Sequence, residues 1–219
     1  MAERFLIFGH RGSPNQQPEN TVASFEAALR GGADGFETDL RLLSDGVAVL
    51  YHDDEVGERP IEALSWSEVE RVGLGIEQLS ELTRFAGRTS MVLEVKRGGW
   101  EKQLIAEVGS WSNVVVASFD HEAIAELARH EPPFALGLTI SGTIVDLAAY
   151  ARSLGATWCY PNYRFVDQRV VSSLHAAAIR VVPWTPDRPQ EWERLRAIGC
   201  DGLITNLPAE AVQWRRGGR

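Results

Sequence analysis

Short apolar runs alternate with helix-like patterns along almost the whole chain, and this alternation limits the fold more than any other feature. The first run, residues 5–8, is continuous, as expected for a strand that is buried on both faces of a parallel sheet. Another strand begins at Gly35, and further strands are predicted at residues 47–52, 91–96, 114–119, 135–140, 157–161, 180–184 and 202–205. Helix-like patterns span residues 22–29, 66–72, 76–85, 121–130, 143–154, 167–178 and 189–198. This order indicates a parallel α/β fold.

The number of strands favours a closed barrel. Nine strands are predicted, but the one at residues 47–52 follows its neighbour through a tight turn and must be antiparallel to it. Eight strands remain, so we expect a (β/α)8 TIM barrel with a β-hairpin extension after strand 2. A doubly wound sheet would more often carry a glycine-rich dinucleotide turn after its first strand. Residues 1–219 are predicted to form a single domain.

The hairpin has a well-defined predicted register. Ser44-Asp45-Gly46 is typical of a tight turn, because an aspartate can hydrogen-bond its own backbone and a glycine adopts positive φ without steric penalty. Pairing across this turn places Leu43 opposite Val47 and Thr38 opposite His52.

Two carboxylates flank the position that faces the imidazole. Glu37 and Asp39 are two residues apart, so on a strand both side chains point to the same face. The ring of His52 is therefore expected to lie between them. Acids and a histidine on an exposed strand face are common, so this hairpin alone leaves the function open.

Polar, charged and aromatic residues collect at the carboxyl ends of the predicted strands, where (β/α)8 barrels carry their active sites. They are His10, Arg11, Glu37, Asp39, Glu94, Lys96, Ser118, Asp120, Trp184, Thr205 and Asn206. Three carboxylates at one barrel mouth would repel one another, and such oxygen donors suit Mg²⁺ or Ca²⁺ better than zinc, which prefers His and Cys. The simpler alternative is that Glu94 only pairs with Lys96 or Arg97.

Composition excludes some classes of function. The formal net charge of −8 argues against general nucleic-acid binding, which needs clustered Lys and Arg. A small anionic substrate would need a local positive cluster or a metal. Cys159 and Cys200 lie in apolar stretches and are expected to be buried, reduced thiols. With no signal-peptide core and no apolar run of membrane-spanning length, we expect a cytoplasmic protein without stable membrane insertion.

An ordered set of motifs resembles the glycerophosphodiester phosphodiesterases, a family of the phosphatidylinositol-phospholipase-C-like phosphodiesterases. The resemblance runs from about residue 5 to residue 208, nearly the whole chain. The motifs are His10-Arg11-Gly12, Pro18-Glu19-Asn20-Thr21, Glu37-Thr38-Asp39, Asp45-Gly46 with His52-Asp53, Glu94-Val95-Lys96, Ser118-Phe119-Asp120, Trp184-Thr185 and Asp201-Gly202-Leu203-Ile204-Thr205. Each motif alone is weak, but the ordered set is specific.

The resemblance implies a metal-dependent hydrolase that cleaves glycerophosphodiesters, such as glycerophosphocholine, to sn-glycerol 3-phosphate and an alcohol. It implies that His10 and His52 are the general acid and base, and imidazoles with an unperturbed pKa of about 6.5 suit that work. We take His10 as the base, an order that the sequence does not fix. By the same resemblance, the metal ligands are Glu37, Asp39 and Glu94, and the phosphate-binding residues are Arg11 and Lys96.

The chain departs from the family pattern at three places. After His52, residues 53–60 replace a longer family segment near the mouth, which leaves substrate choice open. Thr185-Pro186-Asp187 and Thr205-Asn206 also differ from the usual motifs. Trp184 is a candidate substrate-facing wall, with core packing as the alternative. The basic end of the chain, residues 214–219, is expected to be a frayed terminus.

Two rival functions remain open from sequence. One is a related lysophospholipase-D-like activity on lipid-bearing diesters, which apolar residues around the mouth would favour. The other is a non-catalytic barrel that only binds a metal or ligand. The second is disfavoured because all five of the implied catalytic and metal-binding groups are present: His10, Glu37, Asp39, His52 and Glu94.

Overall fold

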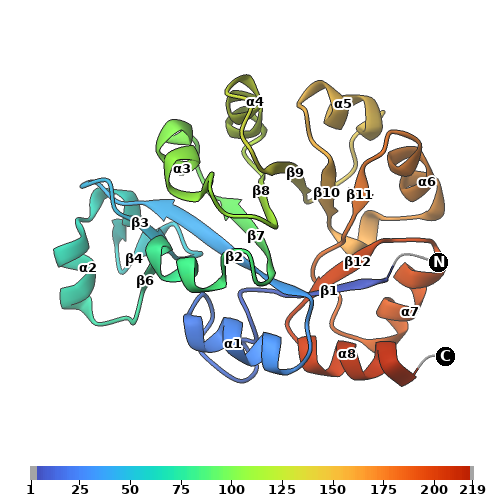
Figure 1. The fold of residues 1–219 in the computed structure, drawn as a ribbon, viewed down its shortest axis with the longest axis horizontal. Coiled ribbons are helices and arrows are strands. Elements are labelled where there is room, and N and C mark those ends of the chain that lie inside the picture. The colour runs from blue at the N-terminus through green and yellow to red at the C-terminus, as the bar shows by residue number, and fades with distance from the viewer. Residues whose placement is uncertain (1–3, 218–219) are drawn as a thin grey trace.

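A computed structural model describes residues 4–217 of the chain. Its centre is a sheet with the strand order β11-β10-β9-β8-β7-β2-β1-β12, in which neighbouring strands are parallel (Figure 1). The strands are β1 (Leu6–Gly9), β2 (Gly35–Leu42), β7 (Ser90–Val95), β8 (Val114–Ser118), β9 (Ala135–Ile140), β10 (Trp158–Pro161), β11 (Arg180–Val181) and β12 (Gly202–Thr205). The eight strands are those that the sequence predicts.

The two ends of this sheet meet between β11 and β12. The backbone N–H of Asp201 donates to the carbonyl of Val181, and that of Ile204 donates to the carbonyl of Pro183, both at 2.9 Å. An isolated parallel bridge also joins Trp184 to Ile204. Strand β11 is shorter than predicted because Pro183 has no N–H to donate to the ladder. The fold is the expected (β/α)8 barrel, closed at this position by these few backbone hydrogen bonds.

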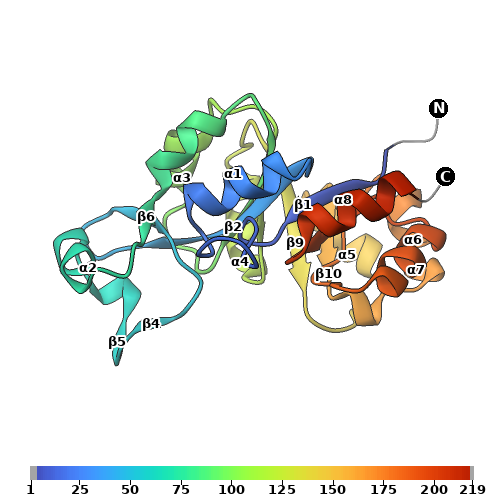
Figure 2. The same ribbon diagram turned by 90° about the horizontal axis from the view of Figure 1, so that it is seen from below.

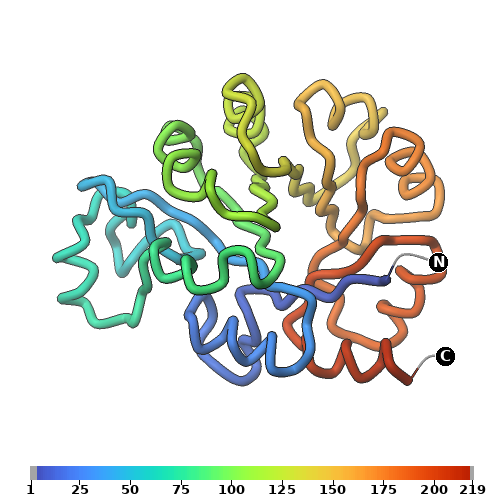
Figure 3. Tube along the Cα trace, viewed as in Figure 1, coloured from blue at the N-terminus to red at the C-terminus, as the bar shows by residue number. Residues whose placement is uncertain are grey.

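The helices that follow the barrel strands cover the outside of the sheet (Figure 3). They are α1 (Val22–Arg30), α3 (Glu101–Val108), α4 (His121–Arg129), α5 (Leu147–Ser153), α6 (Gln168–Ala176), α7 (Pro189–Ala197) and α8 (Pro208–Gly217). Side-chain caps fix several starts, because Thr21, Asp120 and Asp167 each accept a hydrogen bond from the backbone of the first turn. No helix among residues 4–217 is long and apolar enough to cross a lipid bilayer.

The strands are buried on both faces, which explains their continuous apolar runs. Alternate side chains point inward and form a small barrel-interior cluster of Phe8, Val92, Val115, Ala117, Tyr160, Val182 and Ile204. The others face the helices in a larger cluster, where Phe25 stacks on Phe36 with ring centroids 4.2 Å apart. Cys159 and Cys200 are buried free thiols in this outer layer, as predicted.

The predicted hairpin extension projects from one side of the barrel in both Figure 1 and Figure 2. Its strand β3 pairs antiparallel with β2 and matches Leu40 with Leu50, which is the register expected from the turn. The extension has its own small core around Val49 and Ile61. It consists of β3 (Ala48–Leu50), β4 (Glu55–Val56), β5 (Arg59–Pro60), the 3₁₀ helix η1 (Ile61–Ala63), α2 (Trp66–Val72), β6 (Glu77–Gln78) and the 3₁₀ helix η2 (Leu79–Phe85).

The structure corrects two predictions about local structure. The helix expected at residues 76–85 is wrong, because Glu77–Gln78 pairs with the free edge of β3 and only a 3₁₀ helix follows. The frayed terminus expected at residues 214–219 is also wrong for its described part. Helix α8 runs to Gly217, and Arg215 ties it to the barrel through the Phe5 carbonyl at 2.8 Å and an ion pair with Asp34. Residues 218–219 lie outside the described part.

One glycine, Gly9, allows the loop after β1 to turn sharply. A Cβ on Gly9 would lie 2.1 Å from the Gly12 carbonyl oxygen and 2.9 Å from the Cβ of Ala28. Only glycine fits at this close approach. The loop that carries His10 and Arg11 can therefore fold back across the top of the barrel.

Candidate active site

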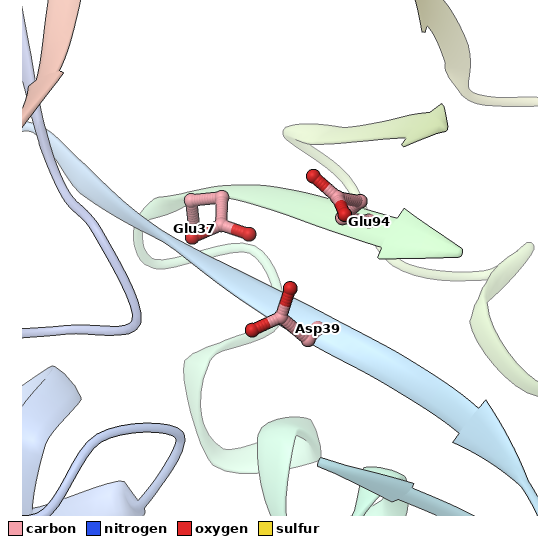
Figure 4. A group of neighbouring side chains, drawn as sticks. All are labelled: Glu37, Asp39 and Glu94. Carbon is pink, nitrogen blue, oxygen red and sulfur yellow. The ribbon is translucent and has the colours of Figure 1, made fainter. Parts of the chain in front are cut away.

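Three buried carboxylates converge at the carboxyl ends of β2 and β7. Glu37 and Asp39 are two residues apart on β2, so both side chains point into the barrel. The β2–β7 register places Asp39 beside Glu94. One oxygen of each carboxylate lies within 4.8 Å of an oxygen of the other two. Figure 4 shows the three side chains turned toward one another from the two strands. The strand pairing therefore concentrates negative charge at one point.

Two basic side chains partly neutralise this cluster. The Lys96 ammonium lies 2.8 Å from Asp39 Oδ1 and also pairs with Glu94. The Arg11 Nε lies 3.1 Å from Asp39 Oδ2. With three carboxylates and two cations, the fully ionised cluster carries one net negative charge, which leaves it able to accept a further cation. Glu94 does pair with Lys96, as the simpler alternative expected, and its carboxylate also lies within 4.8 Å of those of Glu37 and Asp39.

The loop between β1 and α1 is fastened to β2 through Asn20. Its amide Nδ2 donates to Asp39 Oδ2 at 2.8 Å, and its Oδ1 accepts from the hydroxyl of Thr38 at 2.8 Å. Asn20 and Arg11 both have positive φ, of 57° and 52°. Asparagine tolerates this conformation better than most residues, and the tight loop brings Arg11 over the carboxylates.

Burial and mutual repulsion give the three carboxyl groups different pKa values. Burial raises the pKa of Glu37 well above its usual range, and the negative charges of Asp39 and Glu94 add to this effect. Burial also raises the pKa of Glu94 by more than Lys96 lowers it. For Asp39, burial is outweighed by Lys96, Arg11 and the hydrogen bond from Asn20, so its pKa is lowered. Without a bound cation, Glu37 is thus the group most inclined to hold a proton.

His10 is held in one orientation by a chain of hydrogen bonds. Asn206 donates through Nδ2 and its backbone N–H to the two carboxylate oxygens of Asp187, at 2.7 and 2.9 Å. Its carbonyl oxygen must therefore face His10, and it lies 2.7 Å from the ring Nδ1. The ring consequently carries its proton on Nδ1, and Nε2 faces Glu37 at 4.0 Å. Burial and the charge of Arg11 lower the pKa of His10, which keeps the ring neutral.

His52 lies on the opposite, more open side of the site. Its side chain is 37% exposed, and Nδ1 is 2.8 Å from Asp53 Oδ1. The buried Arg41 side chain fixes its backbone, because the guanidinium donates to the His52 carbonyl at 2.8 Å. The same guanidinium pairs with Asp54 and Glu62, both at 2.6 Å. Arg41 therefore fastens the extension to β2.

A cavity of about 260 Å³ opens onto this cluster. One wall carries the charged groups, and the other is mostly apolar and aromatic. Trp184 covers the second wall, with its indole N–H bonded to the Tyr160 carbonyl at 2.8 Å and its ring edge-on to Phe119. All eight site residues singled out from sequence line this cavity: His10, Arg11, Glu37, Asp39, His52, Glu94, Lys96 and Trp184.

Sequence reasoning missed several residues that complete the site. Arg41 has the same strand parity as Glu37 and Asp39, and this signal could have identified it as an inward neighbour. From sequence, Asn206 is one of the polar residues at the strand ends, and Asp187 stands out only as a departure from the family pattern. No sequence signal shows that they contact each other and His10, because they lie on different loops.

Comparison with known proteins gives consistent matches over nearly the whole chain. The model of the glycerophosphoryl diester phosphodiesterase family matches residues 10–91 and 62–210. A glycerophosphodiester phosphodiesterase of Caldanaerobacter subterraneus subsp. tengcongensis is 28% identical over 240 residues, covering 97% of this chain and 99% of that protein. A glycerophosphodiester phosphodiesterase of Bacillus altitudinis is 26% identical and covers 95% and 97%.

Solved structures show the same fold. A crystal structure of a glycerophosphodiester phosphodiesterase from Thermotoga maritima superposes with a TM-score of 0.85 at 22% identity, covering 97% of this chain and 99% of that one. An Oleispira antarctica phosphodiesterase, solved in complex with the product sn-glycerol-3-phosphate, superposes with a TM-score of 0.84 at 23% identity. The superposition with the Oleispira antarctica phosphodiesterase covers 95% of this chain and 96% of that one.

The contacts of Arg41 predict that its loss loosens the extension. Arg41→Gln should lower the free energy of unfolding by about 2–3 kcal/mol, because acidic partners lose a buried cation. Amide hydrogen exchange should quicken in residues 52–63. As a control, the exposed Arg88→Gln should change stability by less than about 0.5 kcal/mol. Unchanged exchange in residues 52–63 of the Arg41 variant would contradict the account.

The raised pKa of Glu37 predicts a pH-dependent stability in cation-free protein. The folded-state pKa lies above the 4.5 of a free glutamate, so between the two values the folded state holds a proton that the unfolded state has lost. Stability therefore falls as the pH rises through this interval. In chelator, urea unfolding from pH about 4 to about 8 should show wild type losing stability relative to Glu37→Gln. If the difference in unfolding free energy between wild type and Glu37→Gln does not vary with pH, the account is contradicted.

Proposed function

The chain belongs to the glycerophosphoryl diester phosphodiesterase family, and on that premise we propose that this cavity hydrolyses glycerophosphodiesters to sn-glycerol 3-phosphate and an alcohol. We propose further that the reaction depends on a divalent cation and on the two histidines. The observation that supports this most strongly is the convergence of Glu37, Asp39 and Glu94 between His10 and His52 in one cavity.

The carboxylate cluster suits a hard divalent cation. Its three ligands are oxygens from buried acids, they lie within 4.8 Å of one another, and the surrounding charge is net negative. This donor set suits Mg²⁺ or Ca²⁺. A bound cation would neutralise the non-bridging oxygens of the phosphodiester as negative charge develops on them. Arg11 and Lys96 lie beside the carboxylates on the same wall of the cavity and would pair with phosphate oxygens next to the cation.

His10 is suited to take a proton from the attacking hydroxyl. Asn206 accepts the Nδ1 proton, so the unprotonated Nε2 faces the carboxylates and the phosphate site. The lowered pKa keeps this nitrogen free of a proton at neutral pH. The attacking hydroxyl can belong to water or to the glycerol of the substrate itself.

His52 is suited to give a proton to the leaving alkoxide. It lies at the open rim of the cavity, where the released alcohol can leave toward solvent. Asp53 holds one ring nitrogen and Arg41 holds the backbone. The ring can therefore present its other nitrogen to the leaving oxygen.

A second class of substrate, lipid-bearing diesters, is favoured by one observation. Phe119 at the mouth is 44% exposed and packs edge-on against Trp184, with ring centroids 5.4 Å apart. An alkyl chain on the departing alcohol could lie against these rings. Activity on lysophospholipids would support this class.

The proposed reaction predicts cation-dependent release of sn-glycerol 3-phosphate from glycerophosphocholine. A coupled assay with Mg²⁺ or Ca²⁺ should show release that chelator abolishes. His52→Ala should lower kcat by roughly 10² or more, the scale of a lost general acid. His130→Ala, at a histidine that pairs with Glu126 on α4 and does not line the cavity, should keep most of the activity. Release that is absent with either metal, or equal in chelator, would overturn the proposal.

A further inference from the structure

The hydroxyl of Tyr160 is a polar group that the mechanism above does not use. The Tyr160 side chain is 1% exposed, and its Oη has no hydrogen-bond partner among residues 4–217. Tyr160 lines the active-site cavity and packs with the apolar residues of the barrel interior. Buried polar atoms in native proteins almost always have a partner, so an unpaired one that borders a binding cavity points to a bonded group in the bound state.

The phenol ring is fixed by close packing. A Cβ on Gly137 would lie 2.6 Å from Tyr160 Cε2, so only glycine at that position lets the ring lie against β9. The ring also stacks on Trp158, with an interplanar angle of 9°. The Tyr160 carbonyl accepts a hydrogen bond from the Trp184 indole N–H at 2.8 Å. The hydroxyl therefore cannot swing away to find a partner in solvent.

The hydroxyl can act only as a hydrogen-bond donor or a neutral acceptor. Burial raises the pKa of Tyr160 well above its usual range, and the nearby Cys159 and Glu37 raise it further. The cavity lining around it is otherwise largely apolar and includes Val92, Ala117 and Ile204. A ligand group that reaches this wall thus meets one neutral hydroxyl in an apolar setting.

We propose that the Tyr160 hydroxyl binds a hydroxyl of the glycerol moiety and makes the site select a glycerol arm over an arm without hydroxyls. This inference rests on the proposed function. The phosphate is drawn to the charged wall by Arg11 and Lys96, so one arm of the diester extends toward Tyr160 and the other toward the rim. An alkyl or choline arm would leave the phenol unpaired, whereas a glycerol hydroxyl satisfies it.

This arrangement gives selectivity through an unfavourable contact as much as through a favourable one. A site built to bond a substrate hydroxyl rejects analogues that lack it, because its own buried group then stays unpaired. Tyr160 is accordingly a specificity-determining residue. The chemical steps assigned to His10 and His52 do not require it.

The test compares two phosphates that differ only in the hydroxyls. Calorimetric titration in Mg²⁺ should show that wild type binds sn-glycerol 3-phosphate more tightly than n-propyl phosphate. Tyr160→Phe, which keeps the ring and its packing on Gly137, should weaken binding of the first by about 10-fold or more and of the second by less than about 2-fold. Tyr150→Phe is the matched control, since its hydroxyl bonds His121 outside the cavity.

Three outcomes would overturn the inference. The first is that wild type binds the two phosphates equally, or binds neither measurably. The second is that Tyr160→Phe weakens the binding of both phosphates equally. The third is that Tyr160→Phe changes the binding of neither. A melting temperature of Tyr160→Phe close to that of wild type would exclude misfolding as the cause of weaker binding. The proposed function fails separately, through absent hydrolysis of glycerophosphocholine, and such a result would not change the binding comparison.

Discussion

The burial of three carboxylates at one point is the constraint on which the rest of this structure depends. Isolated buried charges are strongly unfavourable, and like charges this close raise one another's pKa. The barrel accommodates them because Lys96 and Arg11 lie within ion-pairing distance and Asn20 donates to Asp39. In the proposed function, the same residues would bind the anionic substrate and the cation. Charge compensation in the folded protein and the proposed binding site therefore depend on one arrangement.

Loops from distant parts of the chain are fastened around this cluster by polar contacts. Asn20 holds the first loop to β2, and Arg41 holds the extension and the backbone of His52. On the far side, Asp187 orients Asn206, which in turn fixes the tautomer of His10. The two histidines thus differ in environment: one is buried and neutral, and the other lies at the rim. This difference supports the proposal that the two histidines act in opposite directions in proton transfer.

Much of the fold could be predicted because its signals are local. The turn at Ser44-Asp45-Gly46 sets the hairpin register, and continuous apolar runs mark the strands of the barrel. Prediction failed where tertiary contacts decide, as at residues 76–85, where strand pairing with β3 replaced a helix. The strand ends predicted which residues line one cavity, but the unpaired hydroxyl of Tyr160 depends on side-chain packing that no spacing reveals.

The central claim is that the three acids form one divalent-cation site, and titration calorimetry with Mg²⁺ and with Ca²⁺ tests it most directly. The account predicts one bound cation per chain, weakened by about 10-fold or more in Glu94→Gln, because a ligand and part of the negative charge are lost. Glu70→Gln, at an exposed position on α2, should bind as wild type does. Equal binding by wild type and Glu94→Gln, or no binding at all, would contradict the account.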